Sequence, residues 1–157
     1  SDINLIKVET ANEMFKATQN NLPVDVAIFS AAVGDFKVRK IKNEKLKKKN
    51  NINLELEKNI DILNYVSNHN SLRPKIVIGF SAETNNLEEN SVKKLNTKNC
   101  DWIIANDVSN KSIAFESDFN EVKIFYKDKK IKSEILKKKK KSEISNEIVD
   151  RVLSQLN

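Results

Sequence analysis

The chain is built around a short stretch that reads Val24-Asp25-Val26-Ala27-Ile28-Phe29-Ser30-Ala31-Ala32-Val33-Gly34-Asp35-Phe36. The residues from Val24 to Phe29 are almost continuously apolar, which predicts a strand buried on both faces, as in a parallel sheet. Small residues come next, and a strand that ends in small residues lets another molecule approach its backbone closely. Asp35 follows this strand end, and open α/β sheets bind ligands at the carboxyl ends of their strands.

A basic run from Lys37 to Lys49 follows directly and contains Glu44 as its single acid. An apolar strand, an acidic residue and flexible cations in this order favour a nucleotide site. A core strand followed by a solvated loop is the structural alternative, and these residues alone favour it. The segment from Lys37 to Asn51 has high charge and no clean apolar period, so we expect it to be a mobile flap.

The same strand design occurs twice more, at Lys75–Glu83 and at Asp101–Asp107. Helical patterns lie between the strands. The expected helices begin at the capping box of Thr10 and Glu13, at Asn59 as an N-cap, and at Thr84 or Asn85, the last running to about Lys98.

Further segments complete the expected order of elements. They are a strand at Ile3–Val8, a half-buried strand at Ile52–Glu57, a hairpin of Glu121–Lys127 with Lys130–Ile135, a solvated linker at Lys137–Lys141, and a final helix capped by Ser142. Strands that alternate with helices predict an α/β, three-layer, Rossmann-like fold. We expect a mostly parallel sheet, a late β-hairpin and a C-terminal helix, in a single domain over residues 1–157.

The amino-acid composition of the chain favours some classes of function and excludes others. The chain has 157 residues and a net charge of +6, which suits an anionic partner. Its single cysteine excludes an intrachain disulfide and a cysteine-based zinc site, and its single histidine, His69, gives little support to a histidine-dependent triad. The only glycines are Gly34 and Gly79, so no Gly-rich phosphate loop is present.

The sequence shows neither an apolar run near the roughly 20 residues that span a bilayer nor a signal peptide, so we expect a cytoplasmic protein without a membrane partner. Nucleic-acid binding through the basic runs is a weaker alternative, because no aromatic side chains are interleaved with the lysines. The chain starts directly in a strand-like segment without an initiator Met, and we therefore expect a fragment.

Several short motifs stand in order along the chain. They are Ala31-Ala32-Val33-Gly34-Asp35-Phe36, Glu44-Lys45-Leu46-Lys47-Lys48, Lys58-Asn59-Ile60-Asp61-Ile62, Gly79-Phe80-Ser81-Ala82-Glu83-Thr84-Asn85, the pair Lys94 and Lys98, and Ala105-Asn106-Asp107-Val108. In this order and spacing the chain resembles phosphopantothenate–cysteine ligase, the enzyme of coenzyme A biosynthesis, from about Ile3 to Leu156. In most bacteria that ligase is the C-terminal domain of a bifunctional protein with a flavin-dependent decarboxylase, which the resemblance makes a possible fused or associated partner.

The resemblance implies a two-step reaction. The carboxylate of phosphopantothenate attacks the α-phosphate of CTP and forms an acyl-cytidylate, and the amine of cysteine then displaces CMP. Mg²⁺ accompanies the triphosphate, its protein ligands being unknown. No covalent enzyme intermediate is needed, so catalysis rests on positioning and charge stabilisation. The resemblance also implies a homodimer, with the Glu121–Ile135 hairpin as the candidate interface.

The family's site residues can be carried over by position. The resemblance implies that Phe29, Ser30 and Ala31 form the strand end that meets the nucleotide base. Asp35 matches a nucleotide-contacting aspartate. Lys45 matches the lysine of the flap that closes over the phosphates, and it is the expected catalytic residue.

The remaining carried-over residues follow later in the chain. A helix start that offers backbone N–H groups to the triphosphate is matched by Ile60, Asp61, Ile62 and Leu63. Phe80 matches an aromatic residue at the nucleotide site. Lys94 and Lys98 match two nucleotide-contacting lysines that share one helical face, although a solvated lysine pair is the commoner meaning of this spacing.

This chain departs from the family pattern in two ways. Ile60 stands where the family usually has proline, which loses some rigidity but restores an N–H, so we expect binding to survive. The family's upstream Gly-rich turn and its Ser/Asn/Gly segment, which serve phosphopantothenate, have no counterpart here. An inactive nucleotide-binding α/β module is therefore the alternative to an active ligase, and the residue types alone do not distinguish CTP from ATP.

Overall fold

The computed structural model describes residues 3–39, 53–109 and 117–157, and their described parts divide into two compact units. The first unit takes residues 1–21 and 32–62, and the second takes residues 22–31 and 63–157. Most of the expected flap and its Lys45 lie outside the described residues.

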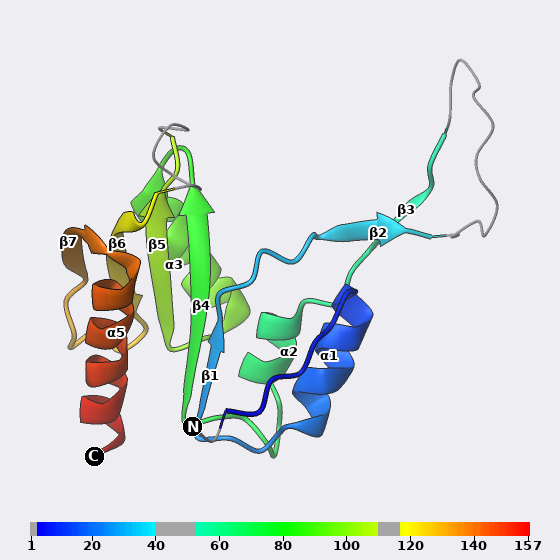
Figure 1. The fold of residues 1–157 in the computed structure, drawn as a ribbon, viewed down its shortest axis with the longest axis horizontal. Helices are drawn as coiled ribbons and strands as arrows, with labels where there is room; N and C mark the ends of the chain where they lie inside the picture. Colours follow the sequence, from blue (N-terminus) through cyan, green and yellow to red (C-terminus); the bar gives the residue numbers. More distant parts are fainter. Residues whose placement is uncertain (1–2, 40–52, 110–116) are drawn as a thin grey trace. The chain divides into compact units, whose positions relative to one another are not determined.

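The second unit is organised around a mixed sheet with the strand order β1-β4-β5-β6-β7 (Figure 1). The strands are β1 Val26–Phe29, β4 Ile76–Glu83, β5 Trp102–Asp107, β6 Phe119–Tyr126 and β7 Glu134–Lys140. β1, β4 and β5 are parallel, whereas β6 and β7 form an antiparallel hairpin on β5. The predicted α/β fold with a late hairpin is confirmed.

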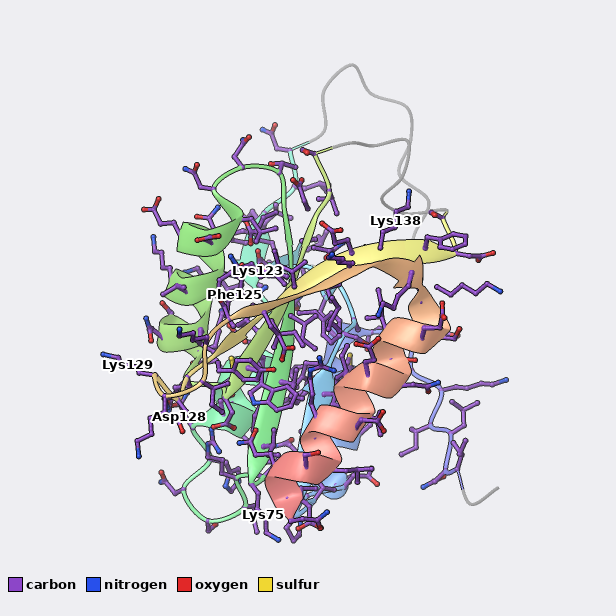
Figure 2. The ribbon with its side chains drawn as sticks, turned by 90° about the vertical axis from the view of Figure 1, so that its left-hand side faces the viewer. Lys75, Lys123, Phe125, Asp128, Lys129 and Lys138 are labelled. Atoms are coloured by element: carbon purple, nitrogen blue, oxygen red, sulfur yellow. The ribbon has the colours of Figure 1, made fainter. Side chains whose placement is uncertain are left out.

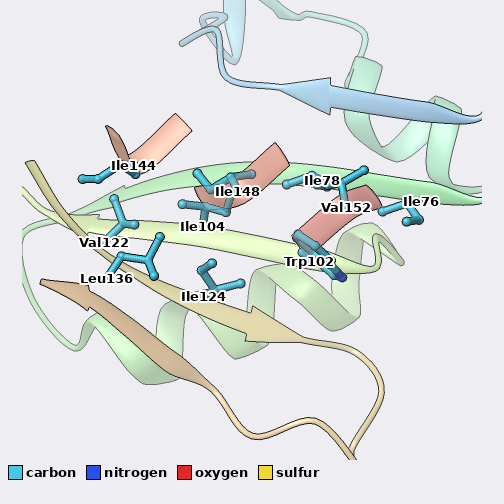
Figure 3. Packing of buried hydrophobic residues seen from close by; sticks show 10 residues of the cluster. All are labelled: Ile76, Ile78, Trp102, Ile104, Val122, Ile124, Leu136, Ile144, Ile148 and Val152. Atoms are coloured by element: carbon cyan, nitrogen blue, oxygen red, sulfur yellow. The ribbon is translucent and has the colours of Figure 1, made fainter. Parts of the chain in front are cut away.

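Two helices cover the sheet on opposite faces, α3 Leu87–Lys98 and α5 Lys141–Leu156 (Figure 2). The apolar residues of α5 recur every four positions, at Ile144, Ile148 and Val152, and all three are buried. They pack with sheet residues into one hydrophobic cluster (Figure 3) that also contains Ile76, Ile78, Trp102, Ile104, Val122, Ile124 and Leu136. The predicted C-terminal helix therefore packs on the sheet as expected.

Polar contacts tie α5 to the hairpin beside this cluster. Arg151 donates from Nε and Nη2 to the two carboxylate oxygens of Glu134, at 2.9 and 2.8 Å. Tyr126 also donates its hydroxyl to Glu134, and Lys139 pairs with Glu147 on α5. Trp102 donates its indole N–H to Gln155 at 3.0 Å. These contacts fix the helix on the hairpin in one register.

The first unit contains helix α1 Ala11–Asn20 and a two-stranded antiparallel ribbon of β2 Phe36–Val38 and β3 Leu56–Lys58. The predicted capping box is confirmed: Glu13 donates its N–H to Thr10 Oγ1 at 3.2 Å, and Thr10 donates its N–H to Glu13 Oε2 at 3.1 Å. In the described parts of the chain, no helix combines the length and apolarity needed to cross a bilayer.

Some strand predictions were wrong because a strand forms only where a neighbour completes its hydrogen bonds. Ile3–Val8 is rich in β-branched and other apolar residues, but it pairs with none of the described residues, and Ile3 and Leu5 are 81% and 76% exposed. Where a strand was predicted at Ile52–Glu57, the structure has the three-residue β3, Leu56–Lys58, which ends one residue later than predicted. Leu56 within it is 59% exposed, so it is not half-buried.

Two further predictions are corrected by sheet position. β1 was expected to be buried on both faces, but it lies at the edge of the described sheet and Ile28 is 46% exposed. The lysine run at Lys137–Lys141 is not a linker. Its first four lysines belong to β7, at the other edge, and α5 begins at Lys141 rather than after a Ser142 cap. Lysines on an edge strand are compatible with pairing on one side only.

Candidate nucleotide site

The carboxyl ends of β1, β4 and β5 meet at one edge of the sheet in the second unit. Phe29 lies beside Gly79, and the β4–β5 register continues to the pair Glu83 and Asp107. Ser81 and Ala105 are small, buried residues that pair with each other near the carboxyl ends of β4 and β5. The repeated design of an apolar strand with a small and polar end thus gives one continuous edge, where α/β sheets bind ligands.

Lys94 lies on α3 beside the carboxyl half of β4. Its side chain reaches from α3 to β4, where Nζ donates a hydrogen bond to the backbone carbonyl of Phe80 at 2.8 Å. The ammonium group has three protons, so this bond leaves it further donor capacity. Lys94 and Lys98 are both half-buried on the same helix, as the four-residue spacing predicts. Phe80 and Lys94 are therefore brought together, whereas the solvated-pair alternative does not describe Lys94.

The start of α3 is tied to the end of β4 by a second polar link. Asn90 donates from Nδ2 to Glu83 at 3.1 Å and to the carbonyl of Asn85 at 3.0 Å. Ser81 donates its hydroxyl to the other oxygen of Glu83. Asn90 and Lys94 are one helical turn apart, so α3 is attached to β4 at two successive turns. Sequence patterns did not single out Asn90, since an asparagine inside a helix has no distinctive signal.

Gly79 explains how α2, Ile62–Ser67, approaches the sheet. A Cβ atom at Gly79 would lie 2.6 Å from Cδ2 of Leu63 and 2.9 Å from Cδ1 of Ile103. A side chain at this position would require the ends of the Leu63 and Ile103 side chains to shift, and glycine leaves room for Leu63 to pack on β4. The φ of Gly79 is not positive, so its backbone conformation does not require glycine. What favours glycine here is the limited space for a Cβ atom.

The first unit contains Asp35 and the segment before α2. The predicted helix start at Asn59 is wrong, since α2 begins at Ile62, and Ile60 and Asp61 precede it. Asn59 does not cap a helix. It donates its backbone N–H to the carbonyl of Asp35 at 2.8 Å and its side-chain Nδ2 to the carbonyl of Gly34 at 2.7 Å. Asx side chains are also turn formers, and here the long-range partner outcompetes the local cap.

The predicted site residues are thus distributed over both units. The first unit holds Asp35, Ile60, Asp61 and Ile62, and the second holds Phe29, Ser30, Ala31, Leu63, Phe80, Lys94 and Lys98. Lys45 lies outside the described residues.

The single cysteine of the chain, Cys100, lies just before β5, at the amino end of that strand and not at the carboxyl edge. Burial raises the pKa of the Cys100 thiol to about 11, so the thiol is protonated at neutral pH. The pKa of Asp107 is lowered because Ser109 donates to its carboxylate, the backbone N–H at 2.8 Å. In residues 3–39, 53–109 and 117–157, no group of three or more His, Cys, Asp or Glu side chains forms a metal-binding cluster.

A cavity of about 720 Å³ lies in the second unit, between the start of α3, the end of β5 and the hairpin. It is lined by residues that include Leu87, Glu88, Lys123 and Ile135, and by none of the predicted site residues. Lys123 crosses from β6 to pair with Glu88 and lies over the Phe125 ring, 5.4 Å from its centre (Figure 2). Ala105 and Asp107 also line the cavity, so it borders the carboxyl end of β5.

Comparison with known proteins decides the family. Residues 1–156 match the family described as "DNA/pantothenate metabolism flavoprotein C-terminal domain". The chain belongs to this family. Two curated members of it are named "Coenzyme A biosynthesis bifunctional protein CoaBC". The one from Borreliella burgdorferi is 41% identical over 94% of this chain, and the one from Haemophilus influenzae is 34% identical over 98%.

The DNA/pantothenate metabolism flavoprotein C-terminal domain family also supplies the structural match. The crystal structure of the C-terminal domain of a CoaBC protein superposes with a TM-score of 0.73 at 31% identity, covering 96% of this chain and 65% of that one. A flavoprotein structure from Streptococcus pneumoniae has a TM-score of 0.70 at 19% identity, covering 96% of this chain and 70% of that one, which shows the shared fold. The chain spans 37% and 38% of the two curated relatives' lengths.

Proposed function

We propose that this chain supplies the CTP-binding part of a phosphopantothenate–cysteine ligase that acts in coenzyme A biosynthesis. Membership of the CoaBC C-terminal family supports the assignment. The single structural observation that carries it is the ammonium of Lys94, held on the Phe80 carbonyl in the carboxyl half of β4. A half-buried cation beside an aromatic residue, in the carboxyl half of a parallel strand, suits a nucleotide with its phosphates.

The proposed reaction joins phosphopantothenate and cysteine in two steps. The phosphopantothenate carboxylate attacks the α-phosphorus of CTP, breaks the bond to the bridging oxygen and releases pyrophosphate. The cysteine amine then attacks the acyl carbon and releases CMP, which leaves the amide. In this proposal the protein contributes position and positive charge, and the protonated Cys100 takes no part.

The proposed roles follow from the places of the residues. Phe29, Ser30 and Ala31 would face the base, and Phe80 would pack near it. Lys94 and Lys98 would neutralise charge on the phosphates, as lysine ammonium groups commonly do. The family resemblance also assigns nucleotide contacts to Asp35 and to the backbone of the segment that starts at Ile60.

Mg²⁺ is proposed as the ion that accompanies CTP. The described residues offer it no carboxylate cage, and lysines cannot ligate it. Mg²⁺ is typically bound through substrate phosphates and water, with few protein ligands, so the triphosphate itself would carry it. It would supply charge neutralisation, and no protein residue is assigned to it.

The experiment that tests the function uses the whole protein as its gene encodes it. Phosphopantothenate, cysteine, CTP and Mg²⁺ should yield phosphopantothenoylcysteine and CMP, measured by mass spectrometry. Calorimetry with CTP, ATP, GTP and UTP should show tightest binding of CTP. Equal affinity for all of them would remove the claim of base recognition, and absence of product with intact CTP binding would favour a nucleotide-binding module without ligase activity.

The remaining partners are proposed from the same family assignment. A flavin-dependent decarboxylase region, fused or associated, would supply the neighbouring step, and we propose a cytoplasmic homodimer as the working form. Nucleic-acid binding remains the less favoured proposal. A titration with random DNA at moderate salt, alongside CTP, separates it from nucleotide binding.

A further inference from the structure

Asn59 connects two stretches of the first unit that are far apart in the sequence. Its backbone N–H donates to the carbonyl of Asp35 at 2.8 Å, and its side-chain Nδ2 donates to the carbonyl of Gly34 at 2.7 Å. Both bonds are short and join residues about 25 positions apart. One residue thus holds two successive carbonyls of the Asp35 turn.

Asn59 lies at one end of the β2–β3 ribbon, and its two hydrogen bonds to the carbonyls of Gly34 and Asp35 are called the clamp below. Phe36 pairs with Lys58 in the β2–β3 register, so Asn59 and Asp35 are the next residues at the open base of the ribbon. At the other end, Arg39 donates its N–H to the carbonyl of Glu55 at 2.9 Å. The clamp therefore adds one more hydrogen-bonded pair, Asp35 and Asn59, at the end of the ribbon opposite Arg39 and Glu55.

The clamp joins two segments that carry separate parts of the proposed nucleotide site. Asp35 is on one side of it, and Ile60 and Asp61 follow Asn59 immediately on the other. Asp35 itself is exposed, and the described contacts of its turn are made by its backbone. A residue that fixes this backbone would fix the direction in which the Asp35 carboxylate points.

We propose that Asn59 is a positioning residue of the nucleotide site, which holds the Asp35 turn against the segment that begins at Ile60. The proposal rests on the proposed function. It assigns Asn59 a role that differs from the helix cap expected of an asparagine before a helix. Any residue except proline retains the backbone bond to Asp35, so the part specific to asparagine is the amide donor to Gly34.

Two substitutions isolate that donor. Asn59→Ala removes the side-chain amide, and Asn59→Asp keeps its shape while replacing the NH₂ donor with an oxygen that faces a carbonyl. Asn53→Ala is the matched control, at an exposed asparagine of the same unit.

The test is calorimetry of CTP with Mg²⁺ on the whole protein, combined with thermal unfolding. Asn59→Ala and Asn59→Asp should weaken CTP binding roughly tenfold, the scale of one lost hydrogen bond, with little change in the unfolding temperature. Asn53→Ala should bind as the wild type does. If Asn59→Ala fails to fold, Asn59→Asp supplies the measurement.

A double-mutant cycle with Asp35→Ala distinguishes positioning from general stability. If Asn59 acts through Asp35, removing Asp35 should weaken CTP binding much less in the Asn59→Ala background than in the wild type. Effects that simply multiply would overturn the inference, as would wild-type affinity in both Asn59 variants. Failure of the wild-type protein to bind CTP would instead overturn the proposed function, and this inference with it.

Discussion

Lys94 makes a contact that its place in the sequence does not reveal. Its ammonium is held on the Phe80 carbonyl, whereas the adjacent Lys93 is exposed. Because the backbone carbonyl orients the ammonium before a ligand arrives, little side-chain entropy remains to be lost on binding.

Lys94→Met should therefore weaken CTP binding about 10- to 100-fold, the range for a hydrogen bond to a charged group. Lys93→Met, one position away, should leave the affinity nearly unchanged. Calorimetry at fixed ionic strength measures both. Equal losses in the two variants would mean that the lysines of α3 act only as a diffuse positive field.

Lys45 is the residue-scale prediction that lies outside the described residues. Its ten-residue spacing from Asp35 matches the family, and a compact ammonium on a flexible stem suits a flap that reaches phosphates. In the whole protein, Lys45→Gln should lower turnover roughly 10²-fold or more, with a smaller loss of CTP affinity.

The controls for Lys45 are its neighbours in the same run. Lys47→Gln and Lys48→Gln should change turnover little when steady-state rates are compared at saturating CTP. A similar loss in all three variants would contradict a special role for Lys45.

At the scale of elements, the attachment of α5 to the hairpin depends on one carboxylate. The bonds from Arg151 lower the pKa of Glu134, with a further contribution from the Tyr126 hydroxyl. A carboxyl whose pKa is lowered by folding stabilises the folded state above its unfolded pKa, and this stabilisation is lost as the pH falls through the folded pKa.

Glu134→Gln should accordingly lower the urea midpoint at pH 7, and the difference from the wild type should shrink below about pH 4, where an unfolded glutamate takes up its proton. Urea titrations at several pH values between 7 and 3 measure this. Glu121→Gln, an exposed glutamate on the same hairpin, is the control. A difference that stayed constant with pH would show that Glu134 contributes through packing alone.

At the scale of the whole molecule, the homodimer remains a prediction, but the structure changes the face that we expect to form it. The β7 edge of the hairpin carries a run of lysines, which oppose edge-to-edge pairing. Phe36, Val38 and Leu56 lie on one face of the β2–β3 ribbon, and all are exposed. Two-stranded ribbons are marginally stable alone, so an apolar partner surface would stabilise this one.

The double substitution Phe36→Ser and Leu56→Ser should convert the whole protein from dimer to monomer in light scattering at micromolar concentrations. Ile131→Ser, at the exposed turn of the hairpin, should leave the dimer intact. A wild-type protein of monomer mass over the same concentrations would remove the prediction.

Local sequence patterns determined those features that depend mainly on interactions between residues close together in the sequence. The capping box at Thr10, the apolar face of α5 and the buried strands β4 and β5 were all predicted, because residue period and chain direction depend on local geometry. The order of elements indicated the α/β class, and the motif spacing indicated the family. The shared helical face of Lys94 and Lys98 also follows from helix geometry alone.

Only the tertiary structure decided which segments find partners. Ile3–Val8 has the pattern of a strand but no described neighbour, and Asn59 has the sequence of a helix cap but bonds to Gly34 and Asp35. The lysine run before α5 forms a strand because β6 satisfies its backbone on one side. In each case the deciding hydrogen bond joins residues distant in sequence, and local propensity carries no information about that partner.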